Sequence, residues 1–253
     1  MAHGPDTEKL LRRVANATTK LDVSRLNITS LPELPPGLQQ LECYDTPLTG
    51  LPALPAGLQM LDCSETNITS LPALPDTLQE LWSYDIPLIS LPTLPLGLRL
   101  LACSYTRVTS LPTLPDTLQR LYCQDTPLTS LPTLPVGLEL LSCWQTQITS
   151  LPTLPVGLEW LYCQDTLLTS LPDLPDGLLD LDCSNTPLIV QRIKGESIKD
   201  YTLRWNEWKS KQRSVERTKV LAEDLIAATW HPDRFERWCL DEEEKKENDT
   251  MIG

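Results

Sequence analysis

Residues 111–130 read LPTLPDTLQRLYCQDTPLTS, and close variants of this phrase return every 20 residues from residue 31 to residue 190. Stacked in register, the eight units keep leucine at positions 1, 4, 8 and 11 and proline at positions 2 and 5 without exception. Residues 21–30 supply the second half of a preceding unit. A repeat of this length indicates stacked structural units, each of which buries its apolar side chains against the next.

The second half of each unit alternates apolar and polar residues, as a half-buried strand does. In the first full unit, Leu41 and Cys43 are expected to point inward, while Gln40, Glu42 and Tyr44 point outward. The two prolines of the other half fix φ and remove N–H donors, which excludes a helix and favours an extended, polyproline-like return. The predicted fold is a repeat solenoid with a parallel β-sheet on its concave face.

Two positions of the unit carry polar or reactive residues. Threonine at position 16 of seven units is expected to satisfy backbone groups that turn inward, in the manner of a ladder. Unit 71–90 alone has Ser83 and Ile86 at positions 13 and 16, which indicates local repacking or simple drift. Because one file of thiols lacks the paired knuckles of a zinc site, we interpret seven cysteines as reduced core residues: Cys43, Cys63, Cys103, Cys123, Cys143, Cys163 and Cys183.

The sequence divides into three regions: residues 1–20 as an N-terminal helical cap, 21–190 as the solenoid, and 191–253 as a C-terminal helical cap with an acidic tail. The apolar spacing predicts a helix over residues 6–18 with one face formed by Leu10, Leu11, Val14 and Ala17. Residues 198–229 are expected to form one long or two shorter helices, in which Trp205 and Trp208 are available to cover the last unit.

The net charge of −13 is concentrated in the array, where residues 31–190 hold 17 acids against three arginines. Phosphate backbones are held by clustered Lys and Arg, so we expect no nucleic acid but a protein partner with a basic or Lys/Arg-rich surface. No apolar run reaches the roughly 18–20 residues that span a bilayer, and the N-terminus lacks a secretory signal pattern. A file of reduced cysteines fits the cytoplasm or another reducing intracellular compartment.

Aromatic residues gather at the outward strand positions 10, 12 and 14, with Tyr105 one position further along. Tryptophan and tyrosine are enriched in binding hot spots, and acids between them select cationic partners. We predict a protein-binding strip formed by Tyr44, Asp62, Trp82, Tyr84, Tyr105, Tyr122, Trp144, Trp160, Tyr162, Asp165 and Asp182. Its expected centre is Tyr122, Trp144, Trp160 and Tyr162. The alternative interpretation is that the rings are only good strand formers and the acids serve solubility.

The phrase Leu-Pro-x-Leu-Pro-x-x-Leu-x-x-Leu-x-Cys resembles the short leucine-rich repeats of secreted bacterial effectors, including those with a C-terminal ubiquitin ligase, and of proteins from large DNA viruses. The resemblance covers about two thirds of the chain. It implies a leucine-rich repeat solenoid and an effector-like binding role, in a host cell if the chain is exported. This chain has cysteine where the bacterial repeats usually have an aliphatic residue, and threonine where they have asparagine.

The C-terminal region suggests alternatives to protein binding through the array. A structural scaffold or particle component would associate through the C-terminal helices. Cys239-Leu240-Asp241 resembles the Cys-x-Asp of the bacterial ligases, but about 60 residues after the array are too few for such a domain. His231-Pro232-Asp233 resembles the loop of J-domains, although a proline at a helix start explains the same turn. We therefore predict no enzyme, no catalytic residue, no cofactor and no metal site.

Overall fold

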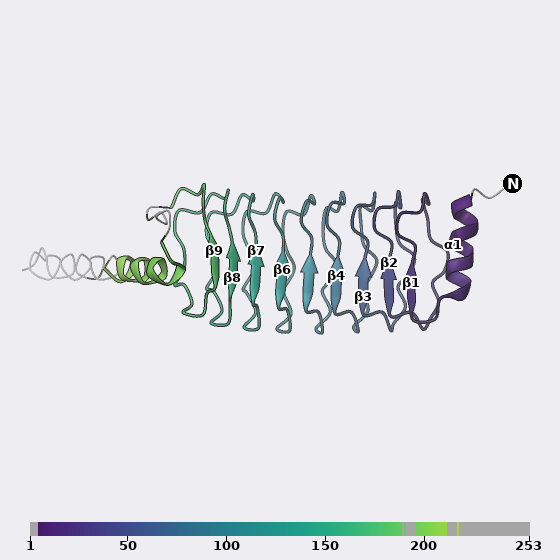
Figure 1. Ribbon diagram of the computed structural model, residues 1–253, viewed down its shortest axis with the longest axis horizontal. Coiled ribbons are helices and arrows are strands. Elements are labelled where there is room, and N and C mark those ends of the chain that lie inside the picture. The colour runs from purple at the N-terminus through teal and green to yellow at the C-terminus, as the bar shows by residue number, and fades with distance from the viewer. Residues whose placement is uncertain (1–4, 189, 191–195, 212–216, 218–253) are drawn as a thin grey trace, which may run out of the picture. The chain divides into compact units, whose positions relative to one another are not determined.

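Nine short parallel strands follow one another at 20-residue intervals in a computed structural model that describes residues 5–188, 190, 196–211 and 217. Figure 1 shows them side by side in chain order. Leu41 lies opposite both Leu21 and Leu61, so the register advances by one whole unit per strand. The predicted repeat solenoid is confirmed. Its strands are β1 (Lys20–Asp22), β2 (Gln40–Glu42), β3 (Met60–Asp62), β4 (Glu80–Trp82), β5 (Leu100–Ala102), β6 (Arg120–Tyr122), β7 (Leu140–Ser142), β8 (Trp160–Tyr162) and β9 (Asp180–Asp182).

The backbone hydrogen bonds between neighbouring units continue beyond the ends of the strands. Cys43 N donates to Asp62 O at 2.8 Å, and Asp45 N donates to Ser64 O at 3.1 Å. Equivalent bonds recur from unit to unit, because the same positions face one another along the array. The leucines at positions 8 and 11 are buried in every unit, whereas the proline half contains neither helix nor strand in the described residues. The core is thus a file of leucines behind the sheet.

The cysteine file lies inside this core. All seven array cysteines are buried and form no disulfide, and burial raises the pKa of the Cys103 and Cys143 thiols to about 12. The Cys43 thiol donates to Asp62 O of the next unit at 3.3 Å. Ser83 makes the equivalent bond to Ala102 O at 3.0 Å, and its strand β4 keeps the common register. Unit 71–90 is therefore not repacked, because serine reproduces the thiol's contact.

The position-16 threonines satisfy buried carbonyls, but within their own unit. Thr46 Oγ1 donates to Cys43 O at 2.7 Å, and the other six threonines make the same bond. The expectation that these hydroxyls satisfy backbone groups is confirmed, and each bond lies inside one unit. A hydroxyl on a short side chain reaches a carbonyl three residues back in the same turn, and this contact closes the turn after the strand in the seven units that have threonine.

Position 15 of every unit lies in the left-handed backbone region, and we call these nine residues the left-handed column. Their φ angles fall between 50° and 61°, and none is glycine. Asp and Asn tolerate this region, whereas other L-residues are disfavoured there by about 1–2 kcal/mol. The column contains Arg25, Asp45, Glu65, Asp85, Tyr105, Asp125, Gln145, Asp165 and Asn185. Five of the nine positions thus have a residue suited to the conformation.

Gln145→Asn is expected to stabilise the array by about 0.5–1 kcal/mol, because asparagine adopts the left-handed conformation at lower cost. The free energy of unfolding, measured by urea titration followed by circular dichroism, tests this. Gln147→Asn is the matched control, since Gln147 is also exposed but has no left-handed backbone. An equal gain from both substitutions would contradict the explanation.

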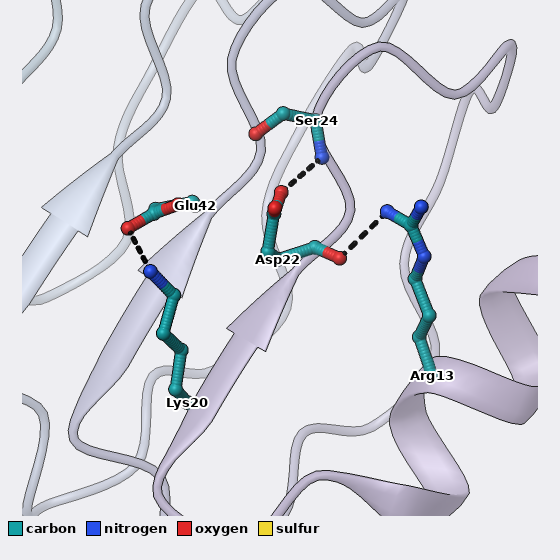
Figure 2. A network of polar contacts seen from close by, with 5 residues as sticks. All are labelled: Arg13, Lys20, Asp22, Ser24 and Glu42. Atoms are coloured by element: carbon teal, nitrogen blue, oxygen red, sulfur yellow. Dashed lines mark hydrogen bonds and ion pairs between the residues drawn. The ribbon is translucent and has the colours of Figure 1, made fainter.

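Helix α1 (Pro5–Asn16) covers the first strand, as expected, but ends earlier than residue 18. Leu10 is buried, whereas Leu11 is 49% exposed. The prediction placed both on one face, yet consecutive residues of a helix lie about 100° apart around its axis. Arg13 Nη1 donates to Asp22 O at 2.8 Å and so replaces the donor that a preceding unit would supply (Figure 2).

The chain forms two compact units, Met1–Thr202 and Leu203–Gly253. In the first, Tyr201 is buried and its hydroxyl donates to Val190 O at 3.0 Å. In the second, the rings of Trp205 and Trp208 lie 5.4 Å apart. Residues 198–211 are helical, in agreement with the start of the predicted helix. Residue 217 is also helical, whereas the other residues of that predicted helix, His231 and Cys239 lie outside the described residues. No described helix is long and apolar enough to cross a membrane.

Candidate functional site: the strand face

The outward residues at positions 10, 12 and 14 form three rows across the sheet, which we call the strand face. The position-10 row runs from Lys20 to Asp180, and the position-12 row runs from Asp22 to Asp182. The position-14 row runs just beyond the strands, from Ser24 to Ser184. Because successive units are in register, a residue in each row lies beside its counterparts in the units before and after.

The position-12 row has an aromatic centre between acidic ends. Its order is Asp22, Glu42, Asp62, Trp82, Ala102, Tyr122, Ser142, Tyr162 and Asp182. Ala102 and Ser142 lie between large rings and are only 3% and 4% exposed. The flanking rings therefore cover their small neighbours. This explains why the rings are half-buried, whereas the sequence predicted exposed ones.

The position-14 row alternates in the same way at its start, with Ser24, Tyr44, Ser64, Tyr84 and Ser104 in turn. Ser64 and Ser104 are buried between these tyrosines and the next residue, Gln124. At the N-terminal end, the Arg25 guanidinium lies 5.5 Å from the centre of the Tyr44 ring. The aromatic side chains thus pack along the sheet. This packing supports, for part of their role, the alternative interpretation that the rings are good strand formers.

Carboxylates hold several rings in place. Tyr162 Oη donates to Asp180 at 3.0 Å, and Tyr84 Oη donates to Glu65 at 3.2 Å. Burial raises the pKa of both tyrosines, and the accepting carboxylates raise it further. Trp82 Nε1 donates to Glu80 at 3.2 Å. The acids Glu65, Glu80 and Asp180 are not among the eleven predicted site residues, although they orient three of them.

The four residues of the expected centre come from three consecutive units. Tyr122 and Tyr162 flank Ser142 in one row, and Trp160 lies beside Leu140 in another. Trp144 instead contacts Tyr105 two units earlier, edge to face, with 6.0 Å between ring centres and 78° between the planes.

Two predicted residues lie in the left-handed column and not on the strand face itself. Tyr105 is 44% exposed, more than any other aromatic residue of the predicted binding strip. It lines a hollow of about 520 Å³ with Asp85, Arg107 and Asp125. Asp165 is also exposed and accepts a hydrogen bond from Asn185 Nδ2 at 2.9 Å. These two residues border the strand face.

Beyond the first strands, the one cation of the strand face is Arg120 of β6, which forms no ion pair with the acids of this face within the described residues. Lys20 pairs with Glu42 at 2.6 Å, which is the one ion pair of this face within the described residues. Asp62, Glu80, Asp180 and Asp182 form none there. The described residues also contain no group of His, Cys, Asp or Glu that could hold a metal ion. The face therefore offers uncompensated negative charge beside partly buried rings.

Asp62→Asn is expected to raise the melting temperature at neutral pH. Burial raises the pKa of Asp62, and the charges of Glu42 and Glu65 add to this effect. A carboxyl whose pKa is raised by folding destabilises the fold when ionised, above that raised pKa, and the penalty is absent below the ordinary value of 3.8. Thermal unfolding at several pH values tests this. A gain that persists at pH 3 would contradict the charge explanation.

The chain matches no protein-family model and no curated protein sequence. Among solved structures, YopM from Yersinia enterocolitica is 38% identical over 63% of this chain and 36% of its own, with a TM-score of 0.63. A leucine-rich effector protein from Yersinia pestis, also YopM, is 29% identical over 72% of this chain and 60% of its own, with a TM-score of 0.64.

A third solved structure is the functional domain of InlJ from Listeria monocytogenes, which includes a cysteine ladder. It is 26% identical over 69% of this chain and 41% of its own, with a TM-score of 0.63. The chain spans between about a third and three fifths of the length of these three proteins. Its sheet, its 20-residue register and these likenesses agree. The chain has the leucine-rich repeat fold with short repeats and is similar in architecture to bacterial leucine-rich effectors.

Proposed function

We propose that the chain is a non-enzymatic protein-binding module whose strand face binds a Lys/Arg-rich segment of another protein. The observation that carries this proposal is the aromatic centre of the position-12 row, which has acidic residues at both ends, while Asp62, Asp180 and Asp182 form no ion pair within the described residues. Partly buried rings supply contact area at low entropic cost, and carboxylates select cations.

Two of the three similar structures support the same general role. The Yersinia pestis protein is described as a leucine-rich effector, and the Yersinia enterocolitica protein has the same name, YopM. A buried file of thiols is stable in a reducing environment, which supports action inside a cell, a host cell included. We infer that the partner contacts Tyr122 and Tyr162 with apolar or aliphatic groups and places its cations against Asp180 and Asp182. The aliphatic stems of Lys and Arg can lie along the rings.

The proposal is tested with the double variant Trp144→Ala/Tyr162→Ala. Purified wild type is expected to bind Lys/Arg-rich peptides in preference to neutral or Glu-rich peptides of the same length. The double variant should lose at least about tenfold in affinity, which corresponds to about 1.4 kcal/mol. Fluorescence anisotropy measures binding, and circular dichroism verifies the fold.

Leu96→Ala/Val156→Ala is the matched control, because both side chains are apolar and more than 80% exposed but lie at position 6, away from the strand face. Equal losses in the two double variants would count against the strand face. Binding of neutral and basic peptides with the same affinity would count against charge selection. Affinity capture with wild type and the first double variant, followed by mass spectrometry, would then identify the natural partner.

A further inference from the structure

The outer edge of strand β1, on the side where α1 lies, pairs with no other strand of the described residues. In a parallel sheet, alternate residues direct their N–H and C=O groups to opposite sides. Thr19 O accepts from Gln40 N at 2.9 Å, and Val23 N donates to Glu42 O at 2.8 Å, so these odd-numbered residues face β2. Lys20 and Asp22 therefore direct their backbone groups away from the sheet. The bond from Arg13 to Asp22 O confirms this direction, because α1 lies on that side (Figure 2).

Most of these outward groups have no protein partner. Within the described residues, Asp22 O is the one bonded group, whereas Lys20 N, Lys20 O and Asp22 N make no hydrogen bond. In every later unit the corresponding groups bond to the strand before. The edge of β1 is thus a short template for one additional strand, and Arg13 provides one of the contacts that such a strand would make.

A basic groove lies along this edge. Side chains of α1 and β1 line an open hollow of about 510 Å³ that contains four cations, Lys9, Arg12, Arg13 and Lys20, together with Asp22. Lys9 and Lys20 are paired with Asp6 and Glu42. Arg12 is exposed and forms no ion pair or hydrogen bond within the described residues. The charge differs from that of the array: residues 1–30 have five basic and three acidic residues, whereas residues 31–190 have three basic and 17 acidic ones.

We propose that this groove binds an acidic peptide segment in an extended conformation, which adds to the edge of β1 as a tenth strand. The free N–H and C=O groups of Lys20 recognise a peptide backbone, because only a backbone offers both a donor and an acceptor at the spacing of a strand. The cations of α1 select acidic side chains. This site is separate from the strand face and selects the opposite charge, so the proposal goes beyond the function proposed above.

The probe is a labelled peptide that alternates glutamate with valine, titrated onto the full chain. A peptide that alternates glutamine with valine has similar strand propensity without the charge. We expect the glutamate peptide to bind at least tenfold more tightly. Amide hydrogen exchange at Lys20 and Asp22 should slow on binding, because a new strand would bond the Lys20 and Asp22 N–H groups. N-methylation of alternate residues of the peptide should abolish binding in one register and not in the other.

Arg12→Glu should weaken binding of the glutamate peptide about tenfold or more. Arg99→Glu, the same charge change at an exposed arginine of the array, should leave it within about twofold. Failure of the glutamate peptide to bind would overturn the proposal. So would binding without slower exchange at Lys20 and Asp22, since charge attraction alone would explain it. Equal competition by single-stranded oligothymidylate would also overturn it and assign the groove to polyanions in general.

Discussion

Leu141→Ala is expected to lower the free energy of unfolding by about 2–5 kcal/mol, the largest stability change we predict. Leu141 of β7 is fully buried and lies between Leu121 and Leu161 of the adjacent strands. Truncation removes apolar contacts with both neighbours and leaves a cavity that a sheet in strict register cannot close. Urea titration followed by circular dichroism gives the free energy. Leu96→Ala, at a site 85% exposed, should change it by no more than about 0.5 kcal/mol.

Pairs of such substitutions test whether stability is local to neighbouring units. Leu41→Ala combined with Leu141→Ala should give the sum of the single costs within about 0.5 kcal/mol, because β2 and β7 share no contact surface. Leu121→Ala combined with Leu141→Ala should deviate from the sum, because the two cavities adjoin. Additivity for the adjacent pair would contradict a stack held together by nearest-neighbour contacts.

The array thiols should react with a thiol reagent roughly a thousandfold more slowly in the folded chain than in urea at pH 8. Burial raises the pKa of Cys43, Cys103 and Cys143 from 9.0 to about 12, and the reactive thiolate decreases tenfold for each unit of pKa. A buried thiolate has lost its solvation, so folding disfavours the charged form and raises the pKa of the thiol. Steric exclusion of the reagent adds to this protection.

The Cys239→Ser variant is the suitable background for this measurement, since the remaining seven thiols are then those of the array. Absorbance of the released reagent group gives the rate. Rapid reaction of any one array thiol under native conditions would contradict the uniform burial of the file. A single slow phase that accelerates together with global unfolding would agree with it.

The repeat made the sheet, its parallel direction and its core predictable, because a leucine or proline that never varies over eight units has the same neighbours each time. The negative charge of the strand face could also be predicted from the sequence. The left-handed column was missed, although Asp or Asn at Asp45, Asp85, Asp125, Asp165 and Asn185 was a signal for it. Tyr105, Glu65 and Gln145 obscured that signal.

The half-burial of the rings was missed for a different reason. It depends on residues 20 positions away, since Ala102 and Ser142 become covered only when their rows are assembled. The bonds of Glu65 and Asp180 to Tyr84 and Tyr162 likewise join residues 18 or 19 positions apart. Two contacts occur at the ends of the array, where the repeat stops: Arg13 with Asp22, and Tyr201 with Val190. The 20-residue period therefore could not predict them.

The threonine bond that closes the turn inside its own unit, in seven of the eight units, bears on how this chain can change over generations. Such a unit carries its own turn, and it meets the units before and after it through one standard set of backbone bonds. Duplication or loss of a 20-residue segment therefore leaves every junction chemically the same. Length can vary by whole units through recombination, while the rows of the strand face acquire new residues without a new fold.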